Sequence, residues 1–301
     1  MNIKYILYAA IDKVKWDACV KQARCTHPYA LSAYLDATTE SKWNALVLGD
    51  YEVVMPLAVR QKMGVQYLYQ PFYSQQLGIY SLVAIDESIE QAFINAIPRN
   101  FSYIDIQLNY THPVSLNQKC NLILDLNHPK EELYANYSNN LKRNIQKALQ
   151  QPLQWNKCDE THTYLTFAKQ VMLEEQQSIY STAIYASLER LTKMLFSMGI
   201  AQIYQVRYHD EICTMMLLIE YRNRLINLAP LTTNKGKEVL SSPFLYHQLI
   251  QQYAGTPIYF DFEGSEIKGV KQFYKQFGAT EENYPILKIN RLPIWMRWLK
   301  K

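Results

Sequence analysis

The stretch from Tyr259 to Gly278, YFDFEGSEIKGVKQFYKQFG, carries side chains suited to proton transfer. An apolar run ends there on Asp261 and Glu263, and Tyr274 follows in a segment with helical spacing. Carboxylates and phenols both act as acids or bases in enzyme sites. Ligands of α/β proteins bind beyond the carboxyl ends of strands. We therefore expect this strand end to lie at a ligand site.

An internal repeat predicts the elements that position this strand end. Segments 45–71 and 204–230 both read as strand, charged turn, strand, short turn, strand and proline. Each is followed by a polar loop, a segment with helical periodicity and a Tyr-apolar-Asp-apolar strand, at 103–106 and 259–262. Turn residues and alternating apolar residues predict an antiparallel three-stranded meander in each half. The strand–helix–strand order predicts a parallel neighbour for the last strand of each meander.

The fold class expected from this repeat is α/β, or α+β with mixed sheets, in two tandem modules. Their boundaries are expected at residues 1–118 and 119–301. A chain of 301 residues, 49% of them hydrophobic, is long enough to form two cores. Helices are expected ahead of the meanders at 13–23, 29–37, 130–150, 161–176 and 185–198.

The expected helix 130–150 carries a basic group near its C-terminal end, with Arg143 and Lys147 as its candidate ligand-binding residues. Apolar residues recur every four positions from Leu133 to Leu149, which predicts one buried face. Positive charge at a helix C-terminus interacts favourably with the macrodipole and needs no ligand. The alternative interpretation is a phosphate clamp, since arginine offers a fixed fork of donors to phosphate oxygens.

Composition argues against several classes of protein. Lys+Arg of 31 against Asp+Glu of 27 gives a net charge of +4, too small for a dedicated nucleic-acid binder. The odd count of five cysteines argues against a disulfide framework, and the six histidines lack ligand spacing, so we expect no metal. No stretch approaches ~18 consecutive apolar residues and no cleavage site follows the N-terminus, so we expect no stable membrane span and a cytoplasmic location. Because a duplicated chain already pairs two modules, we expect a monomer.

The chain resembles the GNAT N-acyltransferase fold in tandem, as in the FemAB-like proteins. Two segments carry the resemblance most specifically: LILDLNHPKEELYANYSNNLKRNIQKA at 122–148 and DFEGSEIKGVKQFYKQFGA at 261–279. The resemblance covers most of the chain. It implies transfer of an acyl or aminoacyl group from an activated donor, with acyl-coenzyme A preferred, to an amine acceptor. It also implies that the second module holds the donor and that the first is a scaffold or an acceptor-binding surface.

The resemblance implies roles for individual residues. The donor would lie where the strand at 259–262 diverges from its neighbour, with Gly264 and Ser265 beside it. Acyl transfer to an amine needs a base for the ammonium and an acid for the leaving group. Asp261 or Glu263 would be the base and Tyr274 the acid. Alternatively, Asp261 binds groups at the strand end and Tyr274 belongs to the core.

The loop after the second meander would bind the donor phosphates. Its candidate residues are Thr233, Asn234, Lys235, Gly236 and Lys237. Members of the fold that use acyl-coenzyme A commonly carry Gln/Arg-x-x-Gly-x-Gly/Ala there, so that backbone amides cradle pyrophosphate. This loop has one glycine and two lysines, which would supply charge in place of the missing amides.

The acceptor candidates are Tyr69 and Tyr73, in a tyrosine-rich meander of the first module and the loop that follows it. Such a surface would hold a sugar, a peptide or a lipid-linked acceptor, although half-exposed sheet faces also favour tyrosine. Transfer from an aminoacyl-tRNA is a second possibility. Cell-wall bridge enzymes often carry Phe-Lys-x-x-Phe-Gly, and here the lysine, Lys275, is shifted by one position. A third is a non-catalytic binding protein that retains the duplicated fold.

Overall fold

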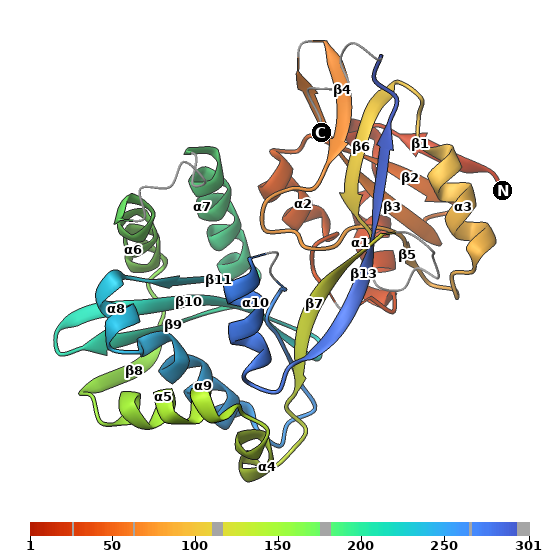
Figure 1. The fold of residues 1–301 in the computed structure, drawn as a ribbon. Helices are drawn as coiled ribbons and strands as arrows, with labels where there is room; N and C mark the ends of the chain where they lie inside the picture. The colour runs from red at the N-terminus through yellow and green to blue at the C-terminus, as the bar shows by residue number, and fades with distance from the viewer. Residues whose placement is uncertain (26, 63, 110–116, 175–181, 265–266, 294–301) are drawn as a thin grey trace. The chain divides into compact units, whose positions relative to one another are not determined.

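The computed structural model describes residues 1–25, 27–62, 64–109, 117–174, 182–264 and 267–293. The chain forms two compact units (Figure 1). Unit 1 contains Met1–Lys119 and the segment from Asn283, and unit 2 contains Cys120–Glu282. The expected second module, 119–301, therefore differs from unit 2 in its last segment. The physical reason is strand pairing, because Ile286–Asn290 hydrogen-bond with a strand of unit 1.

Unit 1 contains the first predicted meander. Antiparallel pairing joins β2 (Trp43–Leu48) to β3 (Val53–Lys62) and β3 to β4 (Val65–Tyr69). β6 (Phe101–Gln107) runs parallel to β4, which confirms the predicted parallel neighbour. The remaining strands lie outside the repeat: β1 (Ile3–Ile6) pairs with β2, β5 (Tyr80–Ser81) with β3, and β13 (Thr280–Asn290) with β6.

Two helices of unit 1, α1 and α3, begin at acidic caps. α1 (Lys13–Gln22) begins after Asp12, whose carboxylate accepts the amide protons of Val14 and Lys15. α3 (Glu87–Ala96) begins after Asp86, which accepts the amide proton of Ile89. Such caps satisfy donors that have no partner within the helix. The other helices are the 3-10 turn η1 (Tyr8–Ala10) and α2 (Ser32–Thr39).

Unit 2 repeats the arrangement of strands. β9 (Ala201–Tyr208), β10 (Glu211–Tyr221) and β11 (Arg224–Thr232) form the second antiparallel meander, and β12 (Tyr259–Asp261) runs parallel to β11. The mixed sheets that the repeat predicts are thus present in both units. β8 (Leu153–Cys158) pairs with β9 at one edge, and β7 (Gln118–Asp125) pairs with β12.

One expected helix of unit 2 is broken. The sequence pattern predicts a single helix over 130–150, but the structure has α4 (Lys130–Ala135) and α5 (Asn139–Leu149). Ser138 interrupts them, because its side chain accepts the amide proton of Leu141 as the cap of α5. The backbone amide of Ser138 donates to the carbonyl of Gln276, at the end of α10, at 2.9 Å, so this amide does not continue the hydrogen bonding of α4.

The other helices of unit 2 cover both faces of its sheet. α6 (Thr161–Glu174) and α7 (Thr182–Ser197) lie on one face, and α5 and α9 (Ser241–Tyr253) lie on the other (Figure 1). α8 (Asn234–Glu238) follows β11, and α10 (Lys268–Lys275) follows β12. Tyr246, Phe260, Phe262, Tyr274 and Phe277 pack together in the core on the α9 side. Within the described ranges, no helix combines the length and the apolar character that a membrane crossing requires.

Candidate functional site

β11 and β12 pair over only three residues of each strand. Arg224–Ile226 pair with Tyr259–Asp261, while β11 continues to Thr232. On the other edge of β11, the register with β10 shifts where Leu217 faces Ala229 and Leu218 faces Asn227. Leu228 is therefore an extra residue, and such a bulge changes where nearby side chains point. Beyond the pairs between β11 and β12, β11 from Asn227 onward and the chain after Asp261 are no longer paired with each other. We call this region the diverging strand edge.

A hydrogen-bonded cluster lies where this edge begins. The Nδ2 of Asn227 donates to the hydroxyl of Tyr246 on α9 at 2.8 Å and to that of Tyr274 on α10 at 3.4 Å. The two hydroxyls lie 3.4 Å apart, with Tyr246 as donor. All three side chains are buried. Asn227 Oδ1 has no hydrogen-bond partner among the described residues, which is uncommon for a buried amide oxygen.

The surroundings keep Tyr274 protonated. Burial raises the pKa of Tyr274 above its ordinary value, and the negative charge of Glu263 raises it further. The hydrogen bonds with Tyr246 and Asn227 lower this pKa, but burial is the larger effect. Burial also raises the pKa of Tyr246 well above that of a free tyrosine. Both phenols therefore carry their protons at neutral pH and are able to donate them.

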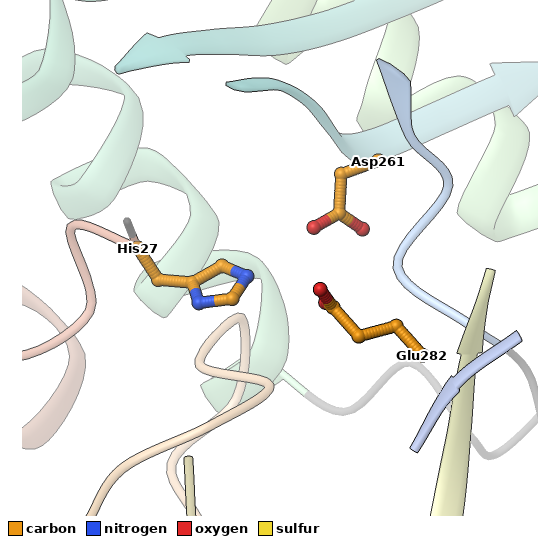
Figure 2. A group of neighbouring side chains, drawn as sticks. All are labelled: His27, Asp261 and Glu282. Carbon is orange, nitrogen blue, oxygen red and sulfur yellow. The ribbon is translucent and has the colours of Figure 1, made fainter. Parts of the chain in front are cut away.

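Asp261 lies in a buried ion pair rather than on an open surface. Its carboxylate is fully buried and accepts hydrogen bonds from Arg224 Nη1 at 2.7 Å and Asn121 Nδ2 at 3.0 Å. The other arm of Arg224 binds Glu282 at 2.6 Å. Figure 2 shows the carboxylates of Asp261 and Glu282 facing one another; His27, also labelled there, is a residue of unit 1. This geometry favours the interpretation that Asp261 anchors the strand end.

Glu263 is the more accessible of the two acids. It is half-buried, and its amide donates to Asp261 Oδ1 at 2.9 Å. Glu263 and Gly264 both have positive φ, 55° and 23°, so the chain turns sharply after the ion pair. A Cβ at Gly264 would lie 2.1 Å from the carbonyl oxygen of Cys120, so only glycine fits there. Ser265 lies outside the described residues.

The candidate phosphate loop is tightly packed around its glycine. Thr233 caps α8 by accepting the amide proton of Gly236 at 3.1 Å, and the amide of Lys237 donates to the carbonyl of Thr233. A Cβ at Gly236 would lie 2.4 Å from the carbonyl oxygen of Cys213. Two backbone donors of the loop are therefore used internally. Lys235, Lys237 and Asn234 are the exposed residues at the start of α8, and Lys235 pairs with Glu238 at 3.3 Å.

The remaining candidates lie on other elements. Arg143 and Lys147 are exposed on α5, which packs against α9. Tyr69 and Tyr73 belong to unit 1. The guanidinium of Arg60 lies 4.0 Å from the ring centre of Tyr69, and the carbonyl of Tyr73 accepts the hydroxyl proton of Tyr34. Within unit 2, the charge of Glu263 acts on the hydroxyl of Tyr274, while Arg143 and Lys147 lie on a separate helix.

Sequence reasoning missed three members of the site: Arg224, Asn227 and Tyr246. One signal was available. Arg224 and Asn227 interrupt the apolar strand RLINLAP, and a polar residue within a buried strand needs a specific partner. Tyr246 lies in a helix rich in apolar residues, where nothing distinguishes it from a core tyrosine.

The fold is shared with solved structures at low sequence identity. FemX matches with a TM-score of 0.68 and 12% identity over 100% of both chains. L-PGS from Bacillus licheniformis matches with a TM-score of 0.56 and 12% identity over 96% of this chain and 95% of that one. A tandem GNAT protein from the clavulanic acid biosynthesis pathway matches with a TM-score of 0.55 and 10% identity over 97% and 99%. No protein-family model and no curated protein matches the sequence. The chain therefore shares its fold with FemX and with the tandem GNAT protein.

Proposed function

We propose that this chain is an N-acyltransferase that holds its activated donor at the diverging strand edge of unit 2. The observation that carries the proposal is the position of Tyr274. Its protonated hydroxyl contacts Asn227, the first residue of β11 beyond the pairing with β12. A proton donor at the point where two strands diverge is suited to a leaving group bound between them.

The proposed reaction transfers an acyl group from a thioester to an amine. Glu263 takes one proton from the incoming ammonium, and the free amine attacks the thioester carbonyl. The C–N bond forms and the C–S bond breaks, with the proton of Tyr274 passing to the leaving sulfur. The second proton of the nitrogen then returns to the Tyr274 phenolate. The products are an amide and a thiol, with one proton on Glu263.

Acyl-coenzyme A is the donor we propose. Lys235 and Lys237 would bind its phosphates, with Thr233, Asn234 and Gly236 shaping the turn. The internal use of two loop amides supports recognition through lysine side chains rather than a backbone cradle. Arg143 and Lys147 would contact anionic groups of the substrates. The aromatic surface around Tyr69 and Tyr73 would bind the amine acceptor.

A thermal-shift titration tests the donor directly, because a ligand of the native state raises apparent stability by mass action. The titration uses acetyl-coenzyme A, longer acyl-coenzyme A species and free coenzyme A. We expect a saturable rise in Tm that the double variant Lys235→Ala/Lys237→Ala loses. Lys157→Ala/Lys169→Ala is the matched control, since it removes two exposed positive charges from β8 and α6 instead. No rise with any of these ligands would contradict a coenzyme A donor and favour an aminoacyl-tRNA donor or a binding protein.

A further inference from the structure

The hydroxyl cluster in unit 2 has a direction. The Nδ2 of Asn227 is only a donor, and it contacts both hydroxyl oxygens. Tyr246 accepts from it and donates onward to Tyr274. The oxygen of Tyr274 is thus an acceptor toward both neighbours. Its own O–H bond is left to donate outside the cluster.

We propose that Asn227 and Tyr246 are positioning residues that fix the Tyr274 hydroxyl as an outward proton donor. This inference rests on the proposed role of Tyr274 as the acid for the leaving group. The two residues touch neither substrate nor reacting atoms in this scheme. They act through Tyr274, by deciding which way its proton points.

The opposite direction is chemically possible, which makes the proposal testable. If the amide of Asn227 presented its oxygen instead, Tyr246 would donate to that oxygen and Tyr274 would donate to Tyr246. Tyr274 would then offer a leaving group only a lone pair. In the observed orientation, Oδ1 is the atom left without a partner among the described residues. Both orientations leave one amide atom unused, so hydrogen-bond satisfaction alone does not choose between them.

The substitution Asn227→Asp tests the direction with almost no change of shape. An ionised carboxylate only accepts hydrogen bonds, so the O–H bonds of Tyr246 and Tyr274 would both point into the cluster. A protonated carboxyl is able to donate to Tyr246 and would restore the outward direction. We therefore expect kcat of the variant, divided by that of wild type, to fall by about a hundredfold as the new carboxyl ionises with rising pH. KM for the donor stays unchanged.

Other titratable groups do not confuse this comparison. Among the described residues, the titratable groups that act on the cluster are Tyr246 from α9, Tyr274 from α10 and Glu263 after β12. Wild type shares all three, so the ratio cancels their titration. Asn227→Ala is the matched control, and we expect a loss of kcat that does not vary with pH. A ratio for Asn227→Asp that is also independent of pH would overturn the proposal.

A second measurement requires no turnover. Tyrosine labelled with 13C at Cζ reports the hydrogen bonding of each phenol by NMR, with Tyr246→Phe and Tyr274→Phe assigning the two signals. In Asn227→Asp, we expect both signals to shift in one common titration step. In Asn227→Asp/Tyr246→Phe, the shift of Tyr274 should be much reduced. A Tyr274 signal that does not shift as the new carboxyl titrates would overturn the inference, even if the variant is active. A common step in a chain that turns over no donor would instead count against the proposed function.

Discussion

The guanidinium of Arg224 donates to the carboxylate of Asp261 at 2.7 Å inside unit 2, where both side chains are buried. Glu282 binds the second arm of the same guanidinium. Burial acts to lower the pKa of Arg224, but the two carboxylates together raise it above its ordinary value. Arg224 therefore stays charged and holds β11, the end of β12 and the start of β13 together.

Breaking this ion pair should destabilise the protein strongly. Asp261→Ala leaves Arg224 buried with one remaining carboxylate, so we expect the free energy of unfolding to fall by about 3–5 kcal/mol. Urea denaturation followed by circular dichroism measures the loss. Asp50→Ala, which removes the partner of exposed Lys15, is the control and should leave stability nearly unchanged. If Asp261→Asn kept full stability but lost turnover, Asp261 would be the base after all.

The two residues of the proposed chemistry should affect turnover and not donor affinity. Tyr274→Phe removes the proton donor and Glu263→Gln removes the base, and each should lower kcat by about a hundredfold or more. Isothermal titration with the donor should give a Kd close to that of wild type for both variants. Tyr253→Phe is the matched control, since its hydroxyl binds Gln202 at 3.2 Å away from the cluster. Unchanged turnover in both variants would remove Tyr274 and Glu263 from the chemistry.

Stability should fall in mild acid because of His247. This ring packs against Tyr134 and Tyr137, and burial lowers the pKa of His247 below that of an ordinary histidine. The unfolded chain then binds a proton that the folded chain excludes, so stability is highest above the unfolded pKa and falls as pH drops toward the folded pKa. We expect the urea midpoint of the wild-type protein to fall as the pH is lowered from about 7.5 to about 5.5. The midpoint of His247→Gln should fall less over the same range. The exposed His162→Gln should retain the wild-type dependence; equal slopes in all three proteins would contradict this assignment.

Two glycines of unit 2 should respond oppositely to alanine. At Gly269 in α10, a new Cβ meets nothing within 4 Å, so the better helix propensity of alanine should stabilise by up to about 1 kcal/mol. At Gly236 in α8, the same atom would collide with the carbonyl oxygen of Cys213. Gly236→Ala should therefore lower Tm and also lower the affinity of the loop for any ligand that binds there. A gain in Tm for Gly236→Ala would contradict the close approach of Gly236 to the carbonyl oxygen of Cys213.

Local signals explain why the repeat predicted the strands well. Charged turns and alternating apolar residues are patterns that span only a few consecutive positions, so both meanders and their parallel neighbours could be predicted from the sequence. The break at Ser138 did not follow, because the carbonyl that holds its amide comes from Gln276, far along the chain. The same limit applies to Asp261. Its acidity suggested a base, while its partners Arg224 and Asn121 are joined to it only by the fold.

The pairing of β13 with β6 affects how the protein is synthesised and dissected. β6 ends at Gln107, and the residues of β13 that pair with its edge, Ile286–Asn290, come after the whole of unit 2 in the chain. On the ribosome, the sheet of unit 1 must therefore wait with one open edge until the final strand is made. Cutting the gene after Lys119 would leave that edge permanently unpaired, which favours aggregation. The segment of unit 2, by contrast, is uninterrupted in the sequence and is the better piece to express alone.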